Sequence, residues 1–191
     1  MKNRLHIMLL TVAMLSMTAC QRNSYKLEGI AKGFADGDTL ILSSDLESLT
    51  PDEELIIDEE GKFGTRQQAD TTVLCALYAK NDPELRTYFF GEPGTIQLTL
   101  NANGRARVSG TKANDAWQRL CDLCSDYERQ IEALAARFYD ENMTEEELSQ
   151  TAERIKLLDQ EKQRWIEQFE KENQENAVGI FLTNHLSQDG L

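Results

Sequence analysis

The hydrophobic period changes once along this 191-residue chain, and that change divides it into two kinds of structure. From Tyr25 to about Gly110, short runs of alternating apolar and polar residues are separated by turn residues, which is typical of β-strands. After Gly110, apolar residues recur at spacings of three, four and seven, which predicts amphipathic helices. We therefore expect an α+β protein: an N-terminal antiparallel β-sandwich or open barrel of about eight strands, followed by a long antiparallel helical hairpin.

Turn residues locate the expected strands. The strands should cover residues 25–32, 38–43, 54–58, 62–66, 72–79, 86–90, 95–100 and 105–109. Asp36-Gly37 predicts a hairpin between the first two strands, and Glu59-Glu60-Gly61 predicts a tight turn between the third and fourth. Thr72–Ala79 is apolar on both faces, so it should be a central strand.

Two helices of nearly thirty residues each are expected in the second half. The first carries one apolar stripe: Trp117, Leu120, Cys121, Cys124, Ile131, Leu134 and Phe138. Thr144 and Glu147 predict a capping box that begins the second helix. Trp165 and Phe169 of that helix should pack against the first helix around Trp117 and Cys121. The alternative is an exposed aromatic surface, Trp165 and Phe169, that docks a partner protein or a second copy.

The first nineteen residues read as a signal peptide. Lys2 and Arg4 precede the apolar stretch Ile7–Met17. The following Met17-Thr18-Ala19-Cys20 resembles the bacterial lipobox, which implies cleavage before Cys20, lipidation of Cys20, and a short tether over residues 20–24. An ordinary secretory signal is the alternative. No acidic residue follows Cys20 directly, and by resemblance to lipoprotein sorting rules this favours the periplasmic face of the outer membrane.

The charge balance restricts the partners. Thirty-three acidic residues against twenty basic ones give a net charge of −13. A nucleic-acid binder must neutralise phosphates with Lys and Arg, so nucleic acid is not expected as a partner. The same balance disfavours docking on an anionic membrane surface. The expected partners are the membrane, through the lipid on Cys20, and an envelope protein; the sequence does not indicate the oligomeric state.

The cysteines are the clearest candidates for chemistry. Cys121-Asp122-Leu123-Cys124 is a CxxC, but its position on the apolar stripe favours packing over thiol chemistry. A zinc site would have only Cys75 and His185 as further ligands, so no metal or other cofactor is expected. We expect His185 to be a surface residue. The acidic runs 52–54 and 58–60 match no EF-hand and should be solvated strand ends, and no catalytic residue is expected.

Several short motifs resemble one known family. They are Tyr25–Ile30, Asp58–Phe63, Phe89–Gly94, and Val108–Thr111 with Asn114. Together they are similar to a Bacteroidetes lipoprotein domain of unknown function, which commonly precedes a thioredoxin-like, peroxiredoxin-related module carrying a catalytic CxxC. This chain ends at Leu191, where such a module would begin. The resemblance therefore implies no catalytic role for Cys121 and Cys124.

These observations give one domain plan and one function. We expect a β domain over residues 25–112, a helical hairpin and return segment over 113–182, and a tail over 183–191. The expected function is a lipid-anchored, periplasm-facing protein with a non-enzymatic binding or scaffold role. The alternative is an accessory component of a thiol–disulfide system.

Overall fold

A computed structural model describes residues 23–140 and 142–189. Two compact units meet between Asp115 and Ala116. The first unit is built from β-strands and the second from helices.

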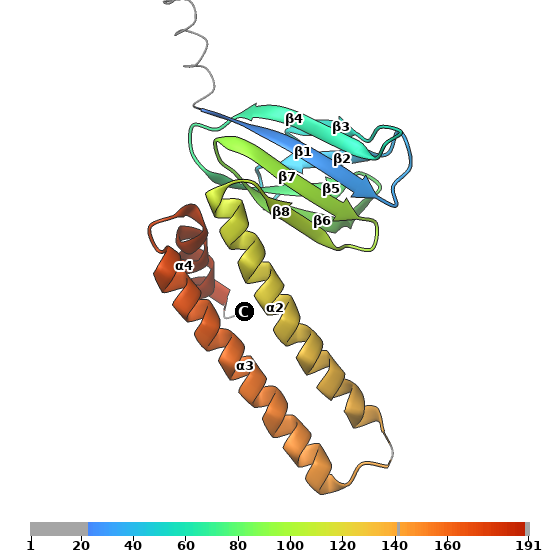
Figure 1. The fold of residues 1–191 in the computed structure, drawn as a ribbon, viewed down its shortest axis with the longest axis vertical. Coiled ribbons are helices and arrows are strands. Elements are labelled where there is room, and N and C mark those ends of the chain that lie inside the picture. Colours follow the sequence, from blue (N-terminus) through green and yellow to red (C-terminus); the bar gives the residue numbers. More distant parts are fainter. Residues whose placement is uncertain (1–22, 141, 190–191) are drawn as a thin grey trace, which may run out of the picture. The chain divides into compact units, whose positions relative to one another are not determined.

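The first unit is a sandwich of two four-stranded sheets (Figure 1). Sheet A has the order β4-β1-β7-β8 and sheet B the order β3-β2-β5-β6. The strands are β1 (Ser24–Lys32), β2 (Thr39–Ser43), β3 (Glu53–Ile56), β4 (Lys62–Gln68), β5 (Val73–Ala79), β6 (Asp82–Gly91), β7 (Gly94–Asn101) and β8 (Ala106–Ser109). The α+β class and the eight strands are confirmed, and the sheets do not close into a barrel.

The strand pairing departs from the expected pattern at two places. β1 and β7 pair in parallel, whereas all other neighbours are antiparallel. The expected hairpin between the first two strands is wrong, because β1 belongs to sheet A and β2 to sheet B. Gly37 does make a turn, at φ +83°, but six residues separate the two strands, which is enough for the chain to cross between sheets. Leu27 of β1 and Leu40 of β2 can then both be buried in the interior.

β5 is a central strand, as its sequence predicts. It lies between β2 and β6, and its Leu77 is fully buried in the sandwich. The opposite face of sheet B is also covered, because Leu46 and Leu49 of the β2–β3 loop pack against buried Tyr78. The Tyr78 hydroxyl donates a 2.8 Å hydrogen bond to the Leu49 carbonyl. This loop explains why the strand is apolar on both faces.

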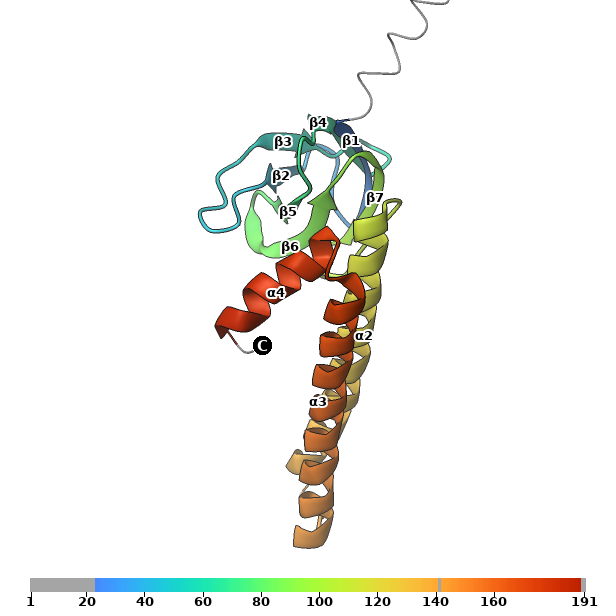
Figure 2. The ribbon, with the colours of Figure 1, turned by 90° about the vertical axis from the view of Figure 1, so that its left-hand side faces the viewer.

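The second unit consists of helices. Its elements are α2 (Lys112–Ala135, whose first four residues belong to the first unit), the 3₁₀ helix η1 (Ala136–Tyr139), α3 (Glu145–Asn173) and α4 (Ala177–Asp189). α2 and α3 run antiparallel, and the capping box of Thr144 and Glu147 begins α3 as predicted (Figure 1). Figure 2 shows α4 leaving the end of α3 at a sharp angle, and Val178 and Leu182 of this segment are buried. Within residues 23–140 and 142–189, no helix is long and apolar enough to cross a membrane.

Candidate functional site

The two cysteines of the CxxC are partly buried on α2 and free. Burial, with smaller contributions from the neighbouring Cys124 and Asp122, raises the pKa of the Cys121 thiol to about 12. Burial also raises the pKa of the Cys124 thiol. A redox CxxC needs an accessible thiolate with a lowered pKa. This environment therefore suits packing and disfavours thiol chemistry.

We expect Cys121 and Cys124 to react slowly with a thiol reagent in the folded protein and fast in denaturant, because their ionised forms are disfavoured and their sulfur atoms are partly covered. Replacing both with alanine should lower the free energy of unfolding by about 1–3 kcal/mol through the space left behind, and valine should cost less. Mass spectrometry of the labelled peptides measures the rates, with buried Cys75 as an internal reference. Rapid labelling of native protein, or insulin reduction that disappears in the double variant, would contradict the packing role.

The raised pKa of Cys121 also predicts a pH dependence. The thiol ionises near pH 9 when unfolded and near pH 12 when folded. Folding thus favours the protonated form, so this contribution to stability is complete below pH 9 and is lost as the pH rises toward 12. Denaturant titrations in this window should show a steeper loss of stability for the wild type than for Cys121→Ala.

The remaining metal candidates have structural roles. Cys75 is buried in β5 beside Tyr25, and burial raises its pKa to about 11. Glu53 accepts hydrogen bonds from Thr65 (2.6 Å) and Gln67 (2.5 Å), which joins the edge strands β3 and β4 of the two sheets. In the part of the chain that the structure describes, no three His, Cys, Asp or Glu side chains form a cluster that could hold a metal ion.

The two aromatic residues of α3 have different environments. Phe169 is buried, but Trp165 is 44% exposed, and Ile166 takes the buried position beside it. Trp117 packs edge-on against Phe181 of α4, with ring centroids 5.7 Å apart. The expected packing is therefore wrong for Trp165. Its side chain instead lines a shallow hollow of about 260 Å³, shared with Tyr127, Glu161, Arg164 and Gln168.

Cys20 and its lipobox lie outside the described residues.

A feature that the sequence analysis missed is the separation of charge between the two sheets. The strands of sheet A carry five basic residues and one acidic residue. Those of sheet B carry four acidic residues and one basic residue. We call the exposed basic residues of sheet A the basic face: Lys26, Lys32, Lys62, Arg66 and Arg107.

Strand alternation places the basic face on the outside of the sandwich. In β1, Leu27, Gly29 and Ala31 are buried, whereas the residues that alternate with them, including Lys26 and Lys32, are exposed. The register places Lys26 directly opposite Arg66 of β4. Lys26 also forms an ion pair with Glu28, the one carboxylate on the strands of this sheet.

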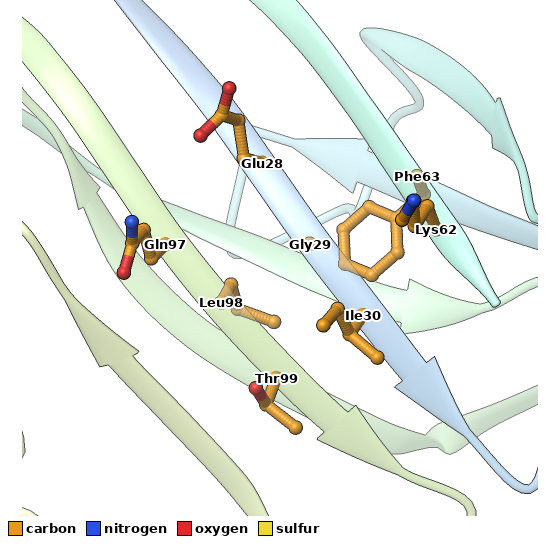
Figure 3. A pocket seen from close by; sticks show the side chains of 8 residues that line it. All are labelled: Glu28, Gly29, Ile30, Lys62, Phe63, Gln97, Leu98 and Thr99. Atoms are coloured by element: carbon orange, nitrogen blue, oxygen red, sulfur yellow. The ribbon is translucent and has the colours of Figure 1, made fainter. Parts of the chain in front are cut away.

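A shallow hollow of about 490 Å³ lies on this sheet. Exposed Glu28, Ile30, Lys62 and Gln97 line it together with Thr99. Figure 3 shows these side chains coming from β1, β4 and β7, with the Phe63 ring against Gly29. The lining carries one cation, Lys62, which pairs with Glu60, and one carboxylate, Glu28, so the hollow by itself has no net positive charge.

The sequence of this sandwich matches a family model over residues 25–117, described as a domain of unknown function (DUF4369). We call this matched stretch, residues 25–117, the DUF4369 domain after the family that it resembles. No curated protein matches the chain. The DUF4369 domain contains both sheets, except for Ser24, and the first residues of α2.

Two of the short motifs, Phe89–Gly94 and Val108–Thr111 with Asn114, meet where β8 gives way to α2. Asn114 is fully buried, accepts a hydrogen bond from the Phe90 N–H and donates one to the Phe90 carbonyl, both at 2.8 Å. Its amide also donates to the Thr111 hydroxyl at 2.7 Å. The Glu92 carboxylate accepts a 2.6 Å hydrogen bond from the Ala113 N–H, at the start of α2. The residues of these two motifs therefore have an architectural role, whereas Lys26 and Lys62 of the basic face belong to the other two motifs, Tyr25–Ile30 and Asp58–Phe63.

Proposed function

We propose that this protein is a lipid-anchored, non-enzymatic envelope protein on the periplasmic face of the outer membrane, which binds an anionic partner through the basic face of its DUF4369 domain. The observation that carries the proposal is the charge separation: five basic residues against one acidic residue on the strands of sheet A, in a chain of net charge −13. Such a concentration favours association with negative charge. The lipid anchor is supported by Met17–Cys20.

A role in thiol–disulfide chemistry has less support. The raised pKa values of Cys121 and Cys124 leave little thiolate at neutral pH. Trp165 and its hollow offer a second surface, although nothing there indicates the chemistry of a partner.

Amine-reactive footprinting of native envelopes tests the binding role. Lys26, Lys32 and Lys62 should label more slowly in envelopes than in detergent-purified protein, because a bound partner covers their amino groups. Lys80, in the turn between β5 and β6 of sheet B, should label equally in both samples. Equal labelling of all four lysines in envelopes and in detergent would refute binding at the basic face.

The anchor is tested by Cys20→Ala, which should abolish incorporation of labelled fatty acid and move the protein to the soluble fraction or leave it unprocessed. The matched control is Cys124→Ala, which should keep the label and the membrane location because this thiol lies on α2. A wild type that incorporates no fatty acid, with a Cys20→Ala variant that still fractionates with membranes, would show that the lipobox interpretation is wrong.

A further inference from the structure

We infer that the partner of the basic face is the anionic phospholipid surface of the membrane in which Cys20 is anchored. This inference rests on the proposed function, since it needs both the lipid on Cys20 and binding at the basic face. It reverses the expectation drawn from net charge alone, because charge is unevenly distributed over the sandwich. An acidic protein can approach a negative surface when one face presents basic side chains to it.

The tether length restricts how far sheet A can lie from the lipid. β1 begins at Ser24, four residues after Cys20. A fully extended chain covers at most about 3.6 Å per residue, so Ser24 lies within about 14 Å of Cys20. That limit is comparable to the distance of about 8–10 Å over which salt screens charges. The end of β1 next to the tether can therefore reach the headgroups, and the rest of sheet A reaches them when the sheet lies along the membrane surface.

The basic pair nearest the tether favours an anionic ligand. Lys26 lies directly opposite Arg66, at the end of β1 that follows Cys20. Like charges directly opposite one another on neighbouring strands destabilise a sheet. A lipid phosphate between the two side chains would relieve that repulsion. The ion pair of Lys26 with Glu28 is exposed and therefore weak, so it does not prevent the lysine from binding phosphate.

The rest of the face permits close approach to a flat surface. The residues between the basic side chains are uncharged, apart from Glu28, and three of them are small: Gly64, Thr95 and Thr99. The basic residues come from three strands, β1, β4 and β8, so the charge is spread over the sheet rather than gathered in one pocket. A spread of single charges fits many separate headgroups better than one compact ligand. Sheet B carries the opposite charge and is the less favourable side for such a surface.

Lysine footprinting of the purified, lipidated full-length protein in defined vesicles tests this inference. One set of vesicles contains phosphatidylethanolamine and phosphatidylglycerol, and the other contains phosphatidylcholine alone. We expect Lys26, Lys32 and Lys62 to label several-fold more slowly in the anionic vesicles, and raised salt to remove the difference. Lys80 should label equally in both. Soluble inorganic phosphate, added to the phosphatidylcholine vesicles, should give no protection.

Charge-reversal variants add a second readout. Lys26→Glu combined with Arg66→Glu should abolish the protection of Lys32 and Lys62 in anionic vesicles. The matched control, Lys156→Glu combined with Lys171→Glu on α3, makes the same change in net charge and should keep the protection. Thermal unfolding of both variants checks that the fold is intact, and the wild-type footprint decides the question if a variant does not fold.

The outcomes separate this inference from the proposed function. Protection in native envelopes but not in anionic vesicles would overturn the inference that the partner is a phospholipid surface. Binding at the basic face would stand, with an acidic protein or a second copy as the partner. Protection in neither sample would overturn both. Protection in anionic vesicles that persists in the Lys26/Arg66 variant would overturn the inference by showing that other residues make the contact.

Discussion

Replacing Asn114 with alanine should lower the free energy of unfolding by about 1–3 kcal/mol, the cost of removing the acceptor of one buried hydrogen-bonding group, the Phe90 N–H. The Asn114 amide is fully buried, and it pairs with both the N–H and the carbonyl of Phe90. The side chain acts as a substitute strand partner for this residue of the edge strand β6. Alanine removes the acceptor of the Phe90 N–H and one donor to the Thr111 hydroxyl, while the Phe90 carbonyl keeps its 3.0 Å hydrogen bond from the Glu92 N–H.

Chemical denaturation of three variants measures this effect. Asn114→Asp keeps an acceptor for the Phe90 N–H but places a carboxylate against the Phe90 carbonyl, so it should be at least as destabilising as alanine. Asn103→Ala is the matched control, since Asn103 is exposed in a turn and accepts one hydrogen bond from the Arg105 N–H. A loss below about 1 kcal/mol for Asn114→Ala would contradict the role as a strand partner, since it would fall within the range of an ordinary exposed hydrogen bond.

Gly29→Ala should also be strongly destabilising, because the place of the new methyl group is already occupied. Gly29 pairs with Phe63 across β1 and β4, and a Cβ at Gly29 would lie 2.0 Å from the Cζ atom of the Phe63 ring. Phe63 is 6% exposed, so its ring has to move out of a packed position. We expect a loss approaching that of Phe63→Ala, about 3–5 kcal/mol.

The double variant tests the mechanism. Removing the ring vacates the space that the new methyl group needs. Gly29→Ala combined with Phe63→Ala should therefore cost little more than Phe63→Ala alone, and the two single losses should not add. Denaturant titrations of the four proteins give the coupling free energy. Additive losses would show that the ring and the methyl group do not compete for the same space.

Local patterns predicted most of the secondary structure. The alternation of Ile96, Leu98 and Leu100 predicts one buried face, and all three side chains are buried in β7. The capping box at Thr144 predicts the start of α3 because its hydrogen bonds span only three residues. Such signals are contained within a few positions, so the sequence alone is enough to interpret them.

Sheet membership could not be predicted in the same way. Asp36-Gly37 is a valid turn signal, but a turn does not determine whether the next strand pairs with the previous one or crosses to the other sheet. That choice depends on which side chains meet in the interior, such as Phe89 against Tyr25, with ring centroids 5.9 Å apart. These two residues are far apart in sequence.

The candidate site was missed for a related reason. A net charge is a sum over the chain, and it hides the basic face because most acidic residues lie on the helices and in the loops. The burial of Asn114 was equally hidden, since a polar residue at a helix start is ordinarily exposed. By contrast, helical periodicity was enough to favour packing over thiol chemistry for the CxxC. The raised pKa values of the two thiols agree with that prediction.

The parallel pairing of β1 with β7 determines when the sandwich can form. Tyr25 pairs with Gly94, about seventy positions later, and contacts between such distant positions slow folding. β1 lies between β4 and β7, so sheet A cannot assemble around it until the chain through Asn101 is present. During synthesis, which starts at the N-terminus, β1 must therefore stay unpaired on its β7 side until more than half of the chain has been made. Folding of this domain is expected to be a late, cooperative event, with the first strand to appear among the last to be completed.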